Sequence, residues 1–250
     1  MKKLDTRFNK DYQINIYDVD TNLQCKFSSI VNYLWDIVIS QSESLGETSN
    51  GLVHNCAWVL LKYDIKIYEY PKFKDIINVE TEVLGVKKFY GLRAYTIRNS
   101  EGKILAEVVS VALLIDIEKR RPMRIAPDQY ELYGLKGDIK EDVVLDDLIK
   151  VENEDYTRDY LTRFSDIDSN KHVNNLKYME MAMDTLPFEI LDKYELARLK
   201  VLFKKETTYG DTIHVSSQVI ENKDNKLITA HTIENSERLL TKLEFKWREK

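Results

Sequence analysis

Apolar residues recur with helical spacing in one early segment and alternate with polar residues through much of the chain that follows. From Phe27 to Val38 they follow the i, i+3, i+4, i+7 pattern, which predicts an amphipathic helix that Gly46 would end. The next segments are rich in Val, Ile and Tyr, which predicts strands. We expect these strands at residues 58–69, 75–84, 89–98 and 103–117.

The second half of the chain repeats this order of elements. A strand is expected from Tyr156 to Phe164, and a helix from about Asn174 to Leu186, where Pro187 would end it. Further strands are expected at residues 196–206, 211–221, 226–234 and 238–247. A long helix followed by a run of antiparallel strands is typical of an α+β fold in which a sheet wraps around the helix.

The two halves are also related in sequence. A shift of 136 positions places residues 75–101 on residues 211–237 without a gap, and 11 of these 27 positions are identical. Such self-similarity indicates a duplicated domain. We therefore expect an N-terminal copy over residues 1–125, an acidic linker over 126–155 and a C-terminal copy over 156–250.

Composition and charge narrow the function classes. Hydrophobic residues make up 43% of the chain, which is enough to build packed cores, and the net charge of −5 argues against a nucleic-acid-binding protein. No apolar run approaches the roughly 20 residues of a membrane-spanning helix. The first residues carry no apolar signal core, so we expect a cytoplasmic protein in which Cys25 and Cys56 are reduced.

The densest polar cluster of the chain runs from Arg163 to Asn175, between a predicted strand and a predicted helix. Such a segment can be a turn with an Asn cap. Alternatively, if the segment is extended, Asp168, Asn170 and His172 share one face, since alternate residues of a strand point the same way. The start of the following helix would offer N–H groups to polarise a carbonyl oxygen, an arrangement that suits hydrolysis of an activated acyl group.

Sites for metals and phosphate groups find little support in the sequence. The cluster begins like a calcium loop, but Lys171 and Lys177 stand where such a loop needs Gly and Glu. His172 has no second His or Cys at zinc-ligand spacing, and no Gly-rich turn precedes a helix. We expect neither a metal nor a cofactor.

Two segments carry a resemblance to a known family. DSNKHVNNLKYMEMAMDTLP, which begins at Asp168, resembles the second-repeat motif of the acyl-acyl-carrier-protein (acyl-ACP) thioesterases, and the segment Trp58–Val83 resembles that family's run ending in Tyr-Pro, an aromatic residue and Asp. These proteins are double hotdog enzymes that release fatty acids from their carrier. The resemblance implies a tandem hotdog with two antiparallel sheets, each wrapped around a long helix. It also implies hydrolysis of fatty acyl-ACP, which ends chain elongation.

The resemblance also assigns site residues. The family's catalytic Asp, Asn and His fall on Asp168, Asn170 and His172, and its catalytic Glu falls on Glu206. Plastid members commonly carry a Cys after that Glu, but this chain has Thr207, so water is the expected nucleophile. Glu206 would act as the base or orient it, and His172 would position the water and assist the leaving thiolate. Asn170 and a backbone N–H would hold the thioester oxygen, with Asp168 orienting its neighbours.

The internal repeat places a single active site in the C-terminal copy. Position 206 maps to Tyr70, and the segment DVDTNLQCKF before the first helix contains no His. We therefore expect the N-terminal copy to contribute much of the acyl pocket rather than catalysis. The partner implied is acyl carrier protein bearing a fatty acyl thioester, and the chain is expected to be a monomer or a homodimer.

Three other functions are compatible with these patterns to different degrees. Single-hotdog acyl-CoA thioesterases carry a similar Asp-to-His-Val-Asn-Asn segment, so CoA esters are an open alternative. Hotdog hydratases normally separate Asp and His by four residues, whereas three lie between Asp168 and His172 and five between Asp166 and His172. A non-catalytic acyl-binding protein would have no need for the complete set of four polar residues.

Overall fold

The computed structural model describes residues 7–45, 56–145, 147–223 and 226–250. Contacts divide the chain into two compact units. The first consists of Met1–Leu61 and Ile67–Val144, and the second of Lys62–Lys66 and Leu145–Lys250. Among the described residues, no helix has the length and apolar character needed to cross a membrane.

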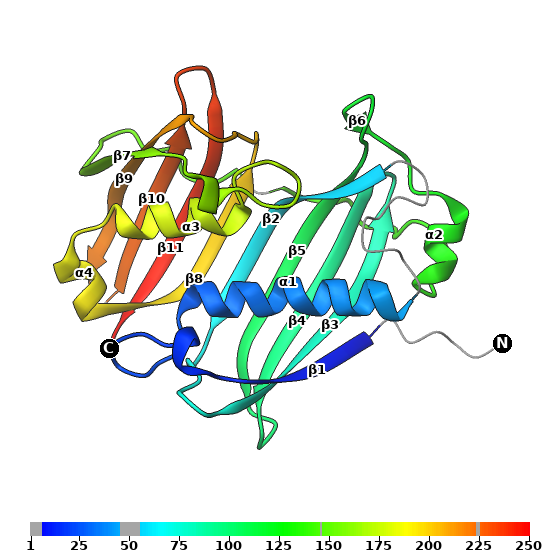
Figure 1. Ribbon diagram of the computed structural model, residues 1–250, viewed down its shortest axis with the longest axis horizontal. Helices are drawn as coiled ribbons and strands as arrows, with labels where there is room; N and C mark the ends of the chain where they lie inside the picture. Colours follow the sequence, from blue (N-terminus) through cyan, green and yellow to red (C-terminus); the bar gives the residue numbers. More distant parts are fainter. Residues whose placement is uncertain (1–6, 46–55, 146, 224–225) are drawn as a thin grey trace. The chain divides into compact units, whose positions relative to one another are not determined.

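The first unit places one long helix on one face of its strands (Figure 1). Its strands are hydrogen-bonded in the order β1-β3-β4-β5-β2, with the short β6 paired to β5. Its elements are β1 (Arg7–Gln13), α1 (Phe27–Ser44), β2 (Cys56–Ile67), β3 (Ile76–Lys87), β4 (Tyr90–Asn99), β5 (Ile104–Asp116), β6 (Arg121–Pro122) and α2 (Pro127–Leu132).

The predicted amphipathic helix is confirmed. The face of α1 that carries Ile30, Val31, Leu34 and Ile37 is buried, as the spacing of these residues requires. The helix continues to Ser44, and Gly46, the predicted stop, lies outside the described residues. Strand β1 was not predicted, because its largely exposed sequence RFNKDYQ lacks an apolar alternation.

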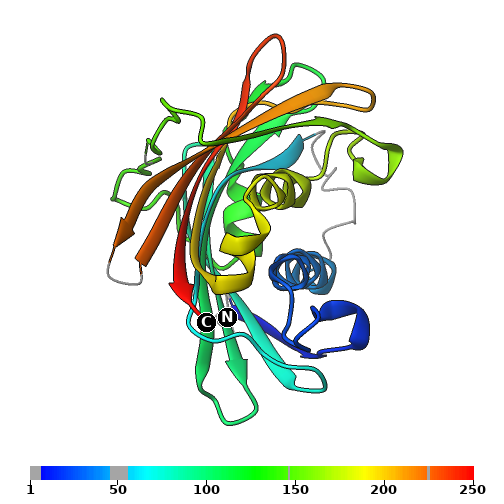
Figure 2. The same ribbon diagram turned by 90° about the vertical axis from the view of Figure 1, so that its left-hand side faces the viewer.

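The second unit repeats the order of a strand, a helix and four strands, with an added short helix, α4, and its main helix is shorter and lies on one face of its strands (Figure 2). Its strands are hydrogen-bonded in the order β8-β11-β10-β9-β7. Its elements are β7 (Tyr156–Leu161), α3 (Asn175–Asp184), α4 (Phe188–Lys193), β8 (Tyr194–Phe203), β9 (Thr212–Lys223), β10 (Lys226–Glu234) and β11 (Leu239–Glu249). Leu176, Met179 and Ala182 of α3 are buried, so this helix covers the core of the unit.

The expected α+β class is confirmed. The expected pair of separate sheets, one for each repeat, is not, because Lys62–Lys66 of β2 belong to the second unit and pair there with β8, from Lys62 opposite Leu202 to Lys66 opposite Arg198. The Arg198 guanidinium also donates two hydrogen bonds to the Asp64 carboxylate, at 2.8 and 2.6 Å. Strand patterns predict hairpins between consecutive strands, whereas a pairing between strands of different repeats leaves no local signal.

The internal repeat is visible in the strands. The shift of 136 positions carries the bounds of β3 onto those of β9 and the first residue of β4 onto that of β10. Equivalent turns keep equivalent bonds as well, since the side chain of Asn99 accepts from the N–H of Glu101 and that of Asn235 accepts from the N–H of Glu237. The repeat therefore describes structure as well as sequence.

Candidate active site

The polar segment between β7 and α3 is a closed loop. A single antiparallel bridge pairs Ile167 with Val173, and the N–H of Asp168 donates to the carbonyl of His172 at 2.9 Å. Lys171 adopts a left-handed backbone conformation with φ of 66°, which lets the chain turn back. The alternative of an extended segment is therefore wrong, because the bridge folds residues 168–172 into a turn.

A buried carboxylate anchors this loop. Asp166 is 1% exposed and accepts hydrogen bonds from the main-chain N–H and the guanidinium of Arg163. Burial alone would raise the pKa of Asp166, but the bonds and charge of Arg163 outweigh it and hold the pKa below its usual range. The Asp166 carbonyl also accepts from the N–H of Asn174, so it ties the start of the loop to its end.

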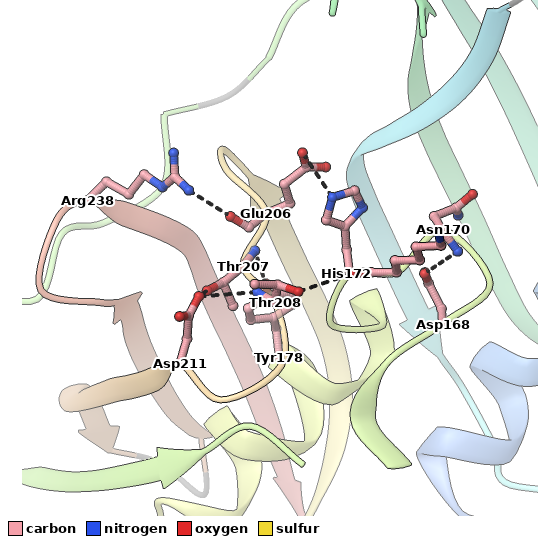
Figure 3. Close-up of polar contacts among 10 residues, drawn as sticks. Asp168, Asn170, His172, Tyr178, Glu206, Thr207, Thr208, Asp211 and Arg238 are labelled. Carbon is pink, nitrogen blue, oxygen red and sulfur yellow. Dashed lines mark hydrogen bonds and ion pairs between the residues drawn. The ribbon is translucent and has the colours of Figure 1, made fainter. Parts of the chain in front are cut away.

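Asp168 shapes the turn through the main chain. Its carboxylate accepts from the main-chain N–H of Asn170 at 2.8 Å. Asp side chains in turns commonly accept from the backbone N–H two residues later. Figure 3 shows this bond between the Asp168 carboxylate and Asn170. The side chains of Asp168 and His172 are half-buried and that of Asn170 is exposed.

Glu206 reaches the site from the end of β8. After Phe203 the N–H groups of Lys204 and Lys205 both donate to the carbonyl of Leu240 on the neighbouring strand, so the chain leaves the sheet at a fixed point. The next residue, Glu206, has a side chain that is 40% exposed. Its main-chain carbonyl accepts from the Arg238 guanidinium at 3.4 Å (Figure 3).

His172 and Glu206 meet across the two segments. The Nε2 atom of His172 lies 3.2 Å from Oε1 of Glu206, although the residues are 34 positions apart in the sequence. Both side chains point toward one another in Figure 3, and both keep some contact with solvent. A carboxylate at this distance holds the imidazole in one orientation.

Two hydrogen bonds, one of them between main-chain atoms, hold the two segments together beside this pair. The N–H of Val173 donates to the carbonyl of Thr207 at 2.9 Å, and the Thr208 hydroxyl donates to the carbonyl of Lys171 at 3.2 Å. Lys171 and Val173 flank His172 in the sequence, and Thr207 and Thr208 directly follow Glu206. The distance between imidazole and carboxylate is thus set by backbone as well as by side chains.

Sequence reasoning missed the residues that support Glu206. The Thr207 hydroxyl bonds to the carboxylate of Asp211, and its N–H donates to the Tyr178 hydroxyl at 3.2 Å. Tyr178 lies on α3 and is 1% exposed, and burial raises the pKa of its phenol above the usual range. Tyr178 was predicted only as part of a helix, and no local pattern reveals that its hydroxyl reaches the chain 29 residues later.

Neither cysteine takes part in this site. Cys25 and Cys56 are buried and are not joined in a disulfide, and both belong to the first unit. Burial raises the pKa of Cys25 to about 12, which leaves the thiol protonated at neutral pH. Tyr70, the residue of the first repeat that is equivalent to Glu206, is 8% exposed.

Comparison with known proteins gives matches along nearly the whole chain. A family model described as "Acyl-ACP thioesterase N-terminal domain" matches residues 5–133, and one described as "Acyl-ACP thioesterase C-terminal domain" matches residues 149–249. A palmitoyl-acyl carrier protein thioesterase of Gossypium hirsutum is 26% identical over 216 residues, which are 80% of this chain and 52% of that protein. This chain spans about half the length of such curated relatives.

Solved structures give a similar result. A putative oleoyl thioesterase from Lactobacillus plantarum superposes with a TM-score of 0.92 at 25% identity and covers 98% of this chain and 97% of its own. The 12:0-ACP thioesterase from Umbellularia californica superposes with a TM-score of 0.86 at 20% identity, over 98% of this chain and 95% of its own. At 20% identity, the match to the Umbellularia californica protein shows a shared fold and no more.

Proposed function

Because the chain belongs to the acyl-ACP thioesterase family, we propose that it hydrolyses fatty acyl thioesters of acyl carrier protein to the free fatty acid and the carrier thiol. The observation that carries this proposal is the 3.2 Å contact between His172, in the loop before α3, and Glu206, in the segment after β8. The two side chains can act as an acid–base pair. Both side chains are partly exposed, so water and a thioester can reach them.

The reaction uses water as the nucleophile. The water oxygen bonds to the thioester carbon as the water loses a proton, either to His172 held in place by Glu206 or to Glu206, which passes it to His172 across their 3.2 Å contact. The resulting tetrahedral intermediate collapses with cleavage of the carbon–sulfur bond. The thiolate sulfur receives its proton from the protonated His172, and the second product is the fatty acid. No covalent acyl-enzyme is formed, in agreement with a Thr207 hydroxyl that is buried and bonded to Asp211.

Asn170 and the start of α3 are proposed to stabilise the oxyanion. The Asn170 side chain stands on the exposed side of the turn, where its amide can donate to the developing negative charge. A backbone N–H near the first turn of α3 would be the second donor. Asp168 acts through the turn, because its carboxylate fixes the main chain of Asn170.

The division of labour between the repeats is part of the same proposal. Each unit would be one hotdog, with hydrolysis confined to the C-terminal copy, residues 156–250, and much of the acyl pocket supplied by the N-terminal copy, residues 1–125, joined by the linker 126–155. All four proposed site residues, Asp168, Asn170, His172 and Glu206, belong to the second unit. The chain would act as a monomer or a homodimer on its carrier protein, without a cofactor.

The test compares thiol release from fatty acyl esters of carrier protein and of CoA. Wild type is expected to release thiol faster from carrier-protein esters, and Glu206→Ala is expected to lose roughly 10²- to 10⁴-fold in turnover. Equal or better turnover of CoA esters would instead assign the chain to the acyl-CoA thioesterases. Near-normal turnover in both Glu206→Ala and His172→Ala would remove the proposed catalytic pair.

A further inference from the structure

The first unit contains a loop with the same backbone as the candidate active site. Val19 forms a bridge with Cys25, just as Ile167 does with Val173, and in both loops the bridge lies before the long helix of the unit. The N–H of Asp20 donates to the carbonyl of Gln24 at 2.8 Å, the counterpart of the 2.9 Å bond from Asp168 to His172. A shift of 148 positions relates the two loops.

The turn inside this loop is also duplicated. The Asp20 carboxylate accepts from the N–H of Asn22 at 2.8 Å, the same distance as from Asp168 to the N–H of Asn170. Leu23 has a φ of 58°, close to the 66° of Lys171. The anchoring carboxylate is present too, because Asp18 accepts from the N–H of Asn15 at 2.9 Å as Asp166 does from that of Arg163.

The bond that sets the distance between the two catalytic segments has a counterpart as well. The N–H of Cys25 donates to the carbonyl of Pro71 at 2.8 Å, matching the 2.9 Å bond from Val173 to Thr207. Gln24 directly precedes Cys25, and Tyr70 directly precedes Pro71. Residues 24 and 70 are therefore placed by the backbone as residues 172 and 206 are in the second unit.

We infer that the loop Asp18–Cys25 together with Tyr70 is a second active-site scaffold for acyl thioesters, silent because Gln24 and Tyr70 stand where the working site has His172 and Glu206. This inference rests on the proposed function of the second unit. Asp20 and Asn22 are the same residue types as Asp168 and Asn170, which are proposed to form and orient the oxyanion site. Both Asp side chains are half-buried and both Asn side chains are exposed.

The side chains of Gln24 and Tyr70 explain why this loop would not hydrolyse a thioester. A Gln amide neither gives nor accepts a proton near neutral pH, and a Tyr phenol with an ordinary pKa near 10 is not a base there. Activation of water and protonation of the leaving thiolate are both lost. Binding of a carbonyl oxygen by the turn needs neither group, so only proton transfer is missing.

The experiment restores the pair in a chain whose working site is switched off. Gln24→His and Tyr70→Glu are introduced into the His172→Ala/Glu206→Ala background, and thiol release is measured with the ester that wild type hydrolyses best. We expect release at least roughly tenfold above the background, since positioned acid–base groups contribute about 10²- to 10⁴-fold. The matched control carries Gln24→His and Tyr70→Gln, which differs by one charge, and is expected to stay at background.

A titration tests the geometry without relying on activity. By NMR, the imidazole introduced at position 24 is expected to have a higher pKa with Tyr70→Glu than with Tyr70→Gln, because an adjacent carboxylate stabilises its charged form. Equal pKa values would overturn the inference. So would background thiol release from a folded Gln24→His/Tyr70→Glu chain while wild type is active.

The same design separates the inference from the proposed function. If wild type hydrolyses no ester, the proposed function fails, and the titration still decides whether positions 24 and 70 adjoin. If Tyr70→Glu does not fold, because Tyr70 is only 8% exposed, a crystal structure of Gln24→His alone is used. An introduced ring packed against Tyr70 supports the inference, and a ring turned away from Tyr70 overturns it.

Discussion

The main-chain N–H of Val173 donates a hydrogen bond to the carbonyl of Thr207 at 2.9 Å, and each of these residues directly follows one member of the His172–Glu206 pair. This backbone hydrogen bond joins the loop before α3 to the segment after β8. Because the backbone holds both residues, the pair has its separation before any substrate binds, and this is the preorganisation that the proposed acid–base catalysis would use.

The Thr207 side chain is predicted to support the site without reacting. Thr207→Val removes the hydroxyl that bonds to Asp211 and keeps the shape and the main-chain bond to Val173. We expect a loss of about 1–3 kcal/mol in the free energy of unfolding, measured by urea denaturation, and less than about a tenfold loss of turnover. A loss of turnover as large as that of Glu206→Ala, with a pre-steady-state burst in wild type, would identify Thr207 as a nucleophile.

Tyr178 is predicted to position Glu206 from within the core. Tyr178→Phe leaves the ring in place but removes the acceptor for the N–H of Thr207, so that a buried donor loses its partner. The expected cost is about 1–3 kcal/mol in unfolding free energy, with a lower kcat and a nearly unchanged KM. Tyr209→Phe, which alters a 65% exposed side chain on the same segment, is the control. Identical kinetics for Tyr178→Phe and wild type would contradict this role.

His172 and Glu206 are predicted to act as one unit. The single variants His172→Ala and Glu206→Gln should each lower kcat by roughly 10²- to 10⁴-fold, and the double variant should be little worse than the poorer single one. Steady-state kinetics of the four chains test this as a double-mutant cycle. If the losses multiplied in the double variant, the two residues would act independently, and the 3.2 Å contact would have no part in catalysis.

A buried histidine in the second unit is predicted to make stability depend on pH. His231 is fully buried between the Ser217 and Thr229 hydroxyls, and burial lowers its pKa to about 3. In the unfolded chain its pKa is near 6.5, so between these values the unfolded state binds more protons, and stability falls as the pH falls. The slope approaches about 1.4 kcal/mol for each pH unit below the upper value.

Denaturation curves between pH 7 and pH 4 measure this dependence. His231→Gln keeps a side chain that can hydrogen-bond to Ser217 but does not titrate, so its stability should depend less on pH than that of wild type. Parallel pH profiles for the two chains would show that acid destabilisation has another source.

Local patterns predicted the parts of this fold that depend on local rules. The spacing of Ile30, Leu34 and Ile37 identified α1, and Pro187 stands at the boundary between α3 and α4. The 136-residue shift identified the paired hairpins β3–β4 and β9–β10. Pairing of β2 with β8 and the polar strand β1 could not be predicted, because they depend on partners distant in sequence.

The candidate site shows the same limit. A short motif marked Asp168, Asn170 and His172, but their arrangement in a closed turn depends on the Ile167–Val173 bridge and on a left-handed residue, Lys171. The matching loop in the first unit was missed for a related reason. It lies at a shift of 148 rather than 136 positions, since the two repeats differ in length between this loop and the strands.

Thiol release from acyl-ACP and acyl-CoA esters of graded chain length, with wild type and Glu206→Ala side by side, tests the central claim most directly. Rapid release from carrier-protein esters that falls by roughly 10²- to 10⁴-fold in Glu206→Ala is the predicted result. Folded wild-type protein that releases thiol from no ester, or a Glu206→Ala chain as active as wild type, would contradict it.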